Sequence, residues 1–321
     1  MDPDYSLLDP IREGTNVGEQ RWDSMKVAVI GGDEREVEVA RLYAASGCAV
    51  SLFGGCDAGD DQDVAHPATL DEALTGADVI VCPMPGVSTD NHLYAPYATE
   101  PIELGEREQR LAATGAVGFV GHATSAMRAA GEAAGVTWID MGADDFLQVR
   151  HAIPTAEGAI ATAIYNTSEP LSGNAVTVIG YGRIGVVLAA MLHGLGARVT
   201  VAARRPEVRA RAEALGYWST GTSPDEVIAA VNGSLVSFAT APARLLTATV
   251  LATLRSDVLI IDLASPPGCV DHASIGPANR VIWARGQAST SVSHSARAQF
   301  DVMAAALDAR RTAVPVASGG L

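Results

Sequence analysis

The feature that most constrains the fold is a glycine turn between a β-branched run and an apolar segment. The run Val176-Thr177-Val178-Ile179 predicts a strand, and Gly180, Gly182 and Gly185 then follow with the spacing G-x-G-x-x-G. In dinucleotide-binding domains the first glycine permits a tight turn, the second lets the backbone approach a pyrophosphate, and the third lets the helix pack close to the strand. The N-terminus of that helix offers unpaired N–H groups to an anion. A second predicted strand over residues 197–202 supplies the context that the motif requires, so we favour dinucleotide binding over a purely structural strand–helix turn.

The end of that second strand distinguishes NADP from NAD. An NAD site usually has Asp or Glu about twenty residues after the glycines, where the carboxylate binds the ribose 2′-hydroxyl. This chain has Ala203 there, followed by Arg204 and Arg205. A guanidinium can bind a 2′-phosphate with two hydrogen bonds, so the sequence predicts NADP, although either arginine taken singly could instead be a solvated surface residue. The predicted cofactor contacts are Gly180, Gly182, Arg183, Ile184, Gly185, Arg204, Arg205, Thr240, Ala241, Pro242, Leu263 and Ala264.

The composition indicates a globular protein with room for two cores, since the chain has 321 residues, of which 48% are hydrophobic and 18% charged. A net charge of −15 argues against nucleic acid and anionic membranes as partners, because neither would be attracted. No signal-peptide pattern and no apolar run of roughly 18 residues is visible, so we expect a cytoplasmic protein. The four cysteines lack metal-binding spacing, so we expect no metal site and reduced thiols that pack as small hydrophobic side chains.

Residues 26–140 alternate between short apolar runs and helical segments, which predicts an open α/β domain. Its first strand ends in the turn Gly31-Gly32-Asp33, which lacks a third glycine. The carboxylates at this helix start suit a capping role and would repel a pyrophosphate. Because open sheets bind ligands at the carboxyl ends of their strands, we predict substrate-side contacts from Gly32, Asp33 and Pro83.

Two open parallel-sheet domains are therefore predicted, a flavodoxin-like N-terminal domain and an NAD(P)-binding Rossmann domain, with a cleft between them. The predicted divisions are an arm over 1–24, a substrate-side domain over 25–150, the Rossmann domain over 151–290, and a C-terminal helix over 291–321 that returns to the first domain and ends in a tail. Residues 150–158 are expected to form a loop from which Thr155 caps a helix over residues 156–167. Pro170 and Gly173 are expected to stop that helix.

With these residues in place, the chain resembles the family of dipicolinate synthase A subunits. Four stretches carry the resemblance: residues 27–33 (VAVIGGD), residues 153–158 (IPTAEG), the glycine turn with Arg204 downstream, and residues 262–265 (DLAS). The resemblance covers most of residues 25–285, and in broader shape the fold is similar to the D-2-hydroxyacid dehydrogenases. It implies a two-domain NADP-dependent dehydrogenase that oxidises a cyclic product, formed from aspartate semialdehyde and pyruvate, to pyridine-2,6-dicarboxylate, usually beside a flavoprotein B subunit.

Departures from the family lie on the substrate side. The family's Asp-Leu-Ala-Ser is followed by an arginine, a proline and a glycine, whereas Ser265 is followed here by Pro266-Pro267-Gly268, so the arginine is missing. In hydroxyacid dehydrogenases the arginine on this turn holds the substrate carboxylate, and their His/Glu pair is not recognisable here. The family's Gly-Leu-Pro-Gly segment with its nearby lysine is replaced by residues 286–291 (GQASTS). A different substrate, or a subunit without its own chemistry, is therefore an alternative.

A nicotinamide enzyme needs from its protein a group that handles a proton and donors that hold the substrate carboxylates. We predict His294 and His122 as catalytic residues, because histidine is the natural proton carrier at neutral pH. Ser265, at the end of a predicted strand, is the third predicted catalytic residue. The alternative for each histidine is an ordinary loop or surface position. Arg285 and Gln287, after the last predicted strand, complete the predicted substrate contacts.

Three functions follow from these observations. The first is an NADP-dependent oxidoreductase that transfers a hydride to or from a small cyclic or imine carboxylate, similar to a dihydrodipicolinate, in a specialised biosynthetic pathway. The second is a cofactor-binding subunit with a non-catalytic or regulatory role. The third is a D-2-hydroxyacid-type dehydrogenase, against which the missing arginine counts. The expected partners are the carboxylated substrate, a flavoprotein-like B subunit and a second copy of the chain in a homo-oligomer such as a dimer.

Overall fold

A computed structural model describes residues 22–56, 59 and 61–313, and the chain divides into two compact units. Unit 1 comprises the chain up to Leu147 together with the chain from Val292 onward, and unit 2 comprises residues 148–291. The predicted divisions were placed at residues 150 and 290, within a few residues of these positions. Most of the predicted arm over residues 1–24, and the predicted tail, lie outside the described residues.

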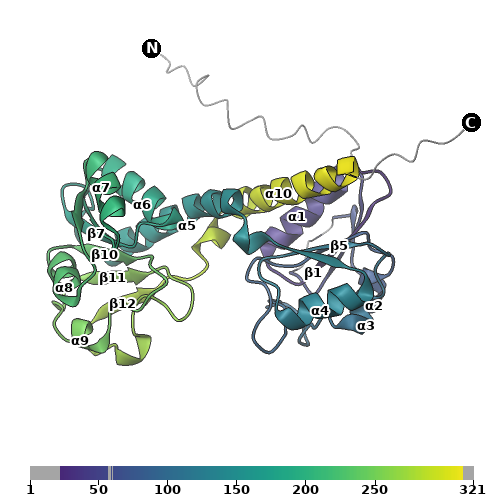
Figure 1. Ribbon diagram of the computed structural model, residues 1–321, viewed down its shortest axis with the longest axis horizontal. Helices are drawn as coiled ribbons and strands as arrows, with labels where there is room; N and C mark the ends of the chain where they lie inside the picture. The colour runs from purple at the N-terminus through teal and green to yellow at the C-terminus, as the bar shows by residue number, and fades with distance from the viewer. Residues whose placement is uncertain (1–21, 57–58, 60, 314–321) are drawn as a thin grey trace, which may run out of the picture. The chain divides into compact units, whose positions relative to one another are not determined.

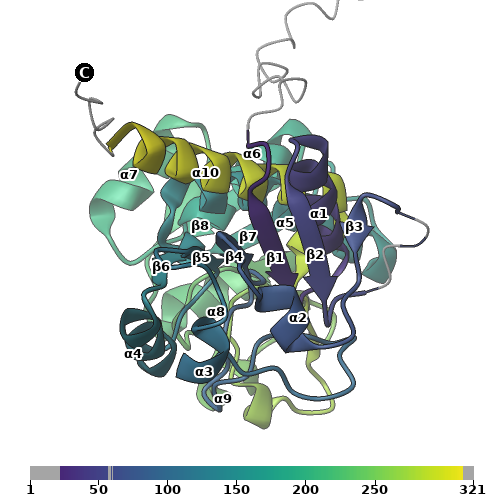
Figure 2. The ribbon, with the colours of Figure 1, turned by 90° about the vertical axis from the view of Figure 1, so that its right-hand side faces the viewer.

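Unit 1 contains the elements labelled α1, β1, β5 and α10 in Figure 1. It is built on a six-stranded parallel sheet with the strand order β3-β2-β1-β4-β5-β6, which can be followed in Figure 2. Its strands are β1 (Lys26–Ile30), β2 (Ala49–Phe53), β3 (Val64–Ala65), β4 (Val79–Val81), β5 (Val117–Val120) and β6 (Thr137–Asp140). Apart from the two-residue β3 at the edge, the strands follow the 2-1-3-4-5 order of flavodoxin-like sheets, as predicted. The order reverses between β1 and β4, the point where open α/β sheets bind ligands at their carboxyl ends.

Each face of this sheet is covered by its own helices (Figure 2). The helices are α1 (Glu34–Ala45), α2 (Leu70–Leu74), α3 (Glu106–Gln109), α4 (Ser125–Ala134) and α10 (Val292–Ala313), with a 3₁₀ turn, η2, at Met141–Ala143. Successive residues of β1 point to opposite faces, so Val27 and Val29 join the core beneath α1 and α10, whereas Ala28 and Ile30 join the core beneath α2 and α4. The strand is therefore apolar on both sides, as a central parallel strand requires.

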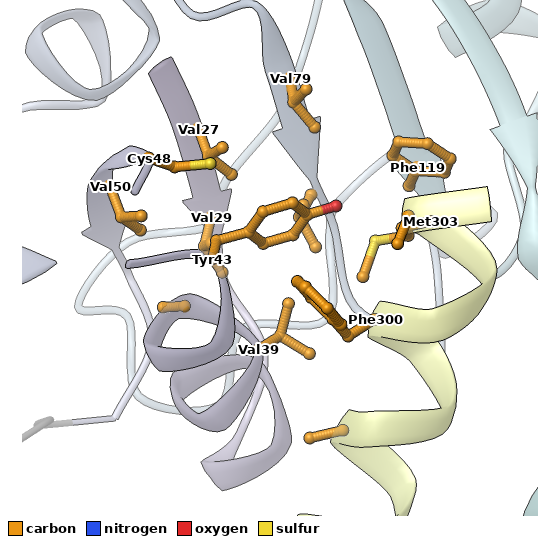
Figure 3. Packing of buried hydrophobic residues seen from close by; sticks show 14 of the residues in the cluster. Val27, Val29, Val39, Tyr43, Cys48, Val50, Val79, Phe119, Phe300 and Met303 are labelled. Atoms are coloured by element: carbon orange, nitrogen blue, oxygen red, sulfur yellow. The ribbon is translucent and has the colours of Figure 1, made fainter. Parts of the chain in front are cut away.

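The last helix, α10, supplies part of the core of unit 1. Phe300 of α10 packs edge-on against Tyr43 of α1, with ring centroids 5.0 Å apart, and Met303 lies beside them (Figure 3). The ring of Trp22 lies 5.8 Å from Tyr43 and 5.9 Å from Phe300. Burial of one such aromatic side chain stabilises a fold by about 2 kcal/mol or more. The two ends of the described chain are thus joined in one core.

Unit 2 is a second six-stranded parallel sheet, in the order β12-β11-β10-β7-β8-β9. Read from β9, this is the 3-2-1-4-5-6 order of a Rossmann domain, with its reversal between β7 and β10. The strands are β7 (Ala175–Ile179), β8 (Arg198–Ala202), β9 (Trp218–Thr220), β10 (Val236–Ala239), β11 (Leu259–Asp262) and β12 (Arg280–Trp283). The helices are α5 (Asp145–Asn166), which begins in unit 1, α6 (Arg183–Gly194), α7 (Pro206–Ala214), α8 (Pro224–Asn232) and α9 (Ala248–Leu251), with 3₁₀ turns η3 (His272–Ser274) and η4 (Gln287–Thr290). Helices α5, α6 and α7 share one core with the sheet, and α8 and α9 share the other.

The prediction of a loop over residues 150–158 was wrong, because α5 runs unbroken from Asp145 to Asn166. Thr155 does not cap a helix; its hydroxyl donates to the carbonyl oxygen of His151 one turn earlier. The helix continues through Pro154 because alanines at helical spacing bury one side of it in the core of unit 2: Ala156, Ala159 and Ala163.

Other expectations concern metals, thiols and membranes. Among the described residues no three His, Cys, Asp or Glu side chains are grouped to hold a metal. Cys48, Cys82 and Cys269 are buried free thiols, and Cys56 is half-buried. In the same part of the chain, no helix is long and apolar enough to cross a membrane.

Candidate functional site

The turn between β7 and α6 has the geometry that its three glycines predict. Gly180 has a φ of +99°, and a Cβ there would lie 2.8 Å from the Thr240 hydroxyl. A Cβ on Gly185 would lie 2.3 Å from the Gly180 carbonyl oxygen, so glycine is what lets α6 approach β7. Gly182 is the N-cap of α6, and a Cβ there would meet no atom within 4 Å. The space in front of the helix N-terminus is therefore open, and the first turn of α6 carries no acidic side chain.

A cavity of about 510 Å³ lies at this turn, at the carboxyl ends of β7, β8 and β10. Its lining is Gly180, Tyr181, Gly182, Ala202, Ala203, Arg204, Arg205, Val208, Thr222, Thr240, Ala241, Pro242, Ala243 and Leu245. The walls are mostly apolar with a few polar groups, which is typical of small-molecule and cofactor sites. Seven of the predicted cofactor contacts line it, namely Gly180, Gly182, Arg204, Arg205, Thr240, Ala241 and Pro242.

The two arginines in this lining differ in their partners. The Arg205 Nε atom lies 3.5 Å from a carboxylate oxygen of Glu207. Arg204 forms no ion pair within the described part of the chain. Arg209 donates from Nη1 to the backbone carbonyls of Ala203 and Arg204, each at 3.0 Å, and so fixes the backbone that carries Arg204. Arg204 is therefore the more available of the two guanidiniums.

The other predicted cofactor contacts do not line the cavity. Arg183 is exposed at the start of α6, Ile184 is half-buried against the core, and Gly185 serves the close packing of the helix. Leu263 and Ala264 are buried directly after β11. The sequence reading missed Thr222, whose position follows from β9 and α8, two elements that it did not predict.

In unit 1 the corresponding turn follows β1, and polar side chains of the chain itself fill it. Asp33 caps α1, and both of its carboxylate oxygens also accept hydrogen bonds from the Arg35 guanidinium at 2.8 Å. Glu36 accepts the backbone N–H of Asp33 at 2.9 Å and is fully buried. A Cβ on Gly32 would lie 2.4 Å from the Glu36 side chain, so this carboxyl group occupies the space above the turn.

Burial acts on both acids in this turn. Burial raises the pKa of Glu36 to about 7 against the attraction of Arg35. Burial by itself would also raise the pKa of Asp33, but the hydrogen bonds and charge of Arg35 bring it below its ordinary value. The Asp33 carboxylate is therefore ionised, and both of its oxygens are already hydrogen-bonded to Arg35 rather than open to a ligand.

The predicted catalytic histidines of unit 1 lie on different elements. His122 follows β5 and is exposed, with its Nδ1 atom 3.6 Å from a carboxylate oxygen of Asp140 at the end of β6. Pro83, after the neighbouring β4, accepts the backbone N–H groups of Gly86 and Gly121. His294 is half-buried in the first turn of α10.

Comparison with known proteins matches the two units to two different families. Residues 26–142 match the family described as the N-terminal domain of the dipicolinate synthase A subunit, and residues 149–275 match the family described as D-isomer specific 2-hydroxyacid dehydrogenase, NAD binding domain. The chain is 29% identical over 248 residues to the dipicolinate synthase A subunit of Bacillus subtilis, covering 77% of this chain and 83% of that protein.

Two solved structures extend the comparison to three dimensions. The crystal structure of the dipicolinate synthase A subunit from Bacillus halodurans superposes with a TM-score of 0.79 at 26% identity, covering 89% of this chain and 98% of that one. The crystal structure of the Bacillus subtilis protein gives a TM-score of 0.78 at 25% identity, with coverage of 91% and 99%. The chain is similar to dipicolinate synthase A subunits, in sequence and in fold, along most of its length. Unit 2 is the NAD(P)-binding domain of an NAD(P)-dependent oxidoreductase.

The turn after β11 lacks the arginine that the resemblance to dipicolinate synthase A subunits leads us to expect. The buried Asp262 carboxylate organises it by accepting the backbone N–H groups of Ala264, Cys269 and Val270 and a hydrogen bond from His272 at 2.9 Å. The His272 ring stacks on Trp283, with centroids 3.9 Å apart. Asp262 therefore has no capacity left for a substrate, and the turn is held by its own residues.

The remaining substrate-side predictions surround this turn without forming one cluster. Ser265 is exposed, and its carbonyl accepts the N–H of Gly268. Arg285 lies 5.2 Å over the Trp283 ring. Gln287 packs against α5, where only a glycine at position 158 leaves room for its side chain.

Proposed function

We propose that this protein is an NADP-dependent oxidoreductase that transfers a hydride to or from a small cyclic or imine carboxylate, similar to a dihydrodipicolinate. The observation that supports it most is the cavity at the β7–α6 turn, which combines an uncovered helix N-terminus with the available guanidinium of Arg204. The names of its relatives support the substrate class.

The residues of unit 2 suit NADP better than NAD. A pyrophosphate lies against the backbone that opens α6, where Gly182 leaves space and no carboxylate of the first helical turn opposes it. The adenosine ribose lies toward Arg204, where an NAD site would present a carboxylate to the 2′-hydroxyl. Arg204 binds the 2′-phosphate, and Thr222 lies in the same lining.

The bound nicotinamide supplies the hydride chemistry, and the protein supplies proton transfer and the grip on the substrate. Of the three predicted catalytic residues, His122 fits a proton carrier best, because its ring is exposed beside a carboxylate. Ser265 and His294 remain candidates for hydrogen bonds to the substrate. Arg285, Gln287, Gly32, Asp33 and Pro83 remain candidate substrate contacts.

Nucleotide titration tests the cofactor assignment. We expect NADPH to bind at least tenfold more tightly than NADH, measured by the change in nucleotide fluorescence. Arg204→Gln should weaken NADPH binding by roughly ten- to a hundredfold, because a hydrogen bond to a charged group is worth about 1.5–3 kcal/mol, and should leave NADH binding unchanged. Arg205→Gln should have a smaller effect, because Arg205 already pairs with Glu207. Indifference of the wild-type protein to both nucleotides would contradict the proposal.

A second function, a cofactor-binding subunit without its own redox chemistry, is favoured by one observation. The turn after β11 presents Pro266-Pro267-Gly268 where a substrate-holding arginine is expected, and its polar groups bind one another. This alternative predicts NADP binding with no hydride exchange toward any dihydropyridine or cyclic imine acid. A D-2-hydroxyacid dehydrogenase is disfavoured by the same missing arginine.

The family also suggests the surroundings in which the protein works. Because its relatives are named as A subunits, we propose a companion B subunit of the flavoprotein type, together with self-association into a homo-oligomer such as a dimer. We further propose a cytoplasmic location and a role in a specialised biosynthetic pathway.

A further inference from the structure

Three side chains of unit 1 meet at the carboxyl edge of its sheet, and the predictions from sequence included only one of them. His122 follows β5, Asp140 ends β6, and Arg128 lies on the second turn of α4, the helix between these strands. The Arg128 Nη2 atom donates to Asp140 Oδ2 at 2.6 Å, and the His122 Nδ1 atom lies 3.6 Å from the same oxygen. One carboxylate oxygen thus binds a guanidinium and lies close to an imidazole.

The backbone beneath this group is fixed by close contacts at glycines. A Cβ on Gly121 would lie 1.8 Å from the Met84 carbonyl oxygen, and a Cβ on Gly86 would lie 2.6 Å from the backbone of His122. A Cβ on Gly142 would lie 2.2 Å from the Gly121 carbonyl oxygen. The main chains of the loops after β4, β5 and β6 therefore pack directly against one another. This packing fixes the backbone position of His122.

The exposed donors of this group are arranged to receive an anion. Arg128 uses one terminal nitrogen on Asp140, and its side chain is 43% exposed. His122 is 73% exposed, so the ring edge away from Asp140 meets solvent. The first turn of α4 carries no acidic residue, so the positive end of the helix adds to the attraction. Asp140 Oδ1, in contrast, is buried and has no hydrogen-bond partner among the described residues, so the carboxylate depends on Oδ2 for its stabilisation.

We infer that Arg128 and His122 form the carboxylate-binding and proton-transfer site of unit 1, with Asp140 as a positioning residue; the inference rests on the proposed oxidoreductase function. Arg128 binds a substrate carboxylate. The Nδ1 atom of His122 faces Asp140, and Nε2 accepts a proton. In the oxidative direction His122 would take the N–H proton that a bound substrate loses as its carbon–nitrogen double bond forms, and an oxidised nicotinamide nucleotide would supply the hydride acceptor.

Binding of pyridine-2,6-dicarboxylate to the full chain tests the role of Arg128. By calorimetry, Arg128→Gln should weaken binding at least tenfold, and Arg128→Lys should restore part of it because a point charge remains. Arg110→Gln is the matched control, since Arg110 is another exposed arginine of unit 1 that pairs with one carboxylate, Glu106, and it should bind as the wild type does. Wild-type affinity in Arg128→Gln, or no binding by the wild-type protein, overturns the inference.

The tautomer of His122 tests the role of Asp140 without any substrate or turnover. In ¹⁵N spectra assigned with a His122→Asn variant, the neutral ring should carry its proton on Nδ1, and Asp140→Asn should shift it toward the Nε2–H form. Asp140→Glu should keep the wild-type tautomer. An Nε2–H ring in the wild-type protein overturns the positioning role.

The two proposals fail separately. NADPH titration of each variant should give the wild-type affinity, because Arg128 and Asp140 lie in unit 1. Loss of NADPH binding by the wild-type protein would contradict the proposed function, whereas the dicarboxylate and tautomer measurements would still decide the role of this group.

Discussion

The first strand–helix turn of unit 1 and that of unit 2 occupy the same place in two parallel sheets and have opposite contents. After β1, Asp33 caps the helix and Glu36 covers Gly32, so carboxyl groups fill the turn. After β7, the N-cap is Gly182, which has no side chain, and Arg204 lies nearby in the cavity.

The difference shows that fold alone does not make a nucleotide site. Both turns offer a helix N-terminus, but in unit 1 the amide of Asp33 already donates to Glu36, and the amide of Gly32 donates to the carbonyl of Tyr94. In unit 2 a glycine leaves the helix end uncovered. Side chains within six residues of the strand end therefore decide which of the two turns accepts an anion.

The largest expected effect is the pH dependence of stability that the buried Glu36 gives to the turn of unit 1. The folded pKa of Glu36 is about 7, above its ordinary value of 4.5, so its contribution to stability is complete below about pH 4.5 and is lost as the pH rises through 7. Glu36→Gln cannot titrate. Its stability relative to the wild type should therefore rise by about 3 kcal/mol between pH 4.5 and pH 8, measured by urea unfolding.

The control for that measurement is Glu226→Gln, which alters the capping box of α8 at an exposed position. The pKa of Glu226 is lowered by the hydroxyl and backbone of Ser223, so that variant should lose relative stability as the pH rises through the carboxylate range. Parallel pH profiles for Glu36→Gln and the wild type would show that Glu36 is ionised in the folded state.

The next effect is a loss of NADPH affinity when the turn of unit 2 is made to resemble that of unit 1. Gly182→Asp places a capping carboxylate where Asp33 stands in unit 1, and aspartate is a favourable N-cap, so the fold should persist. The carboxylate should repel the pyrophosphate and weaken NADPH binding about a hundredfold, or about 2.7 kcal/mol, in a fluorescence titration. Gly182→Asn, of equal size and no charge, separates repulsion from bulk and should lose much less affinity. Equal losses in both variants would show that charge is not what distinguishes the turns.

The smallest effect is the difference in the free energy of unfolding between alanine substitutions at Gly32 and at Gly182. Gly32→Ala should destabilise the protein by about 2 kcal/mol, because its φ is +90° and the new Cβ would overlap the Glu36 side chain. Gly182→Ala should cost less, about 0.5–1 kcal/mol, because its φ is −91° and its Cβ meets no atom within 4 Å, so only the poorer N-cap preference of alanine counts. Chemical denaturation of both variants gives this comparison, and similar losses would contradict it.

Much of the fold was predictable because it depends on local patterns. The apolar runs at β1 and β7, each followed by glycine, predicted buried parallel strands, and both sheets follow the predicted topologies. The helix α5 was predicted too short, because Pro154 was read as part of a loop, whereas packing of the alanines in unit 2 holds it within a helix. The short strand β9 has too few residues to show a period, and only its pairing with β8 defines it.

The part of the candidate site that one sequence motif forms was predictable. The part formed by residues far apart in the sequence was not. The glycine spacing and the two arginines identified the cavity of unit 2, since all of them belong to one strand–helix–strand segment. Arg128 and Asp140 were missed because their partnership with His122 depends on neighbouring strands β5 and β6 ending at the same edge. A histidine two residues after a buried strand was the only local signal.

The place of α10 in the core of unit 1 has a consequence for synthesis on the ribosome. The aromatic contact between Tyr43 and Phe300 joins a segment synthesised before unit 2 to a segment synthesised after it. All of unit 2 is therefore present in the nascent chain before unit 1 receives its last helix, so unit 2 can complete its fold first. During that interval the apolar surface beneath Phe300 is exposed, and it is there that a chaperone would be expected to bind the growing polypeptide.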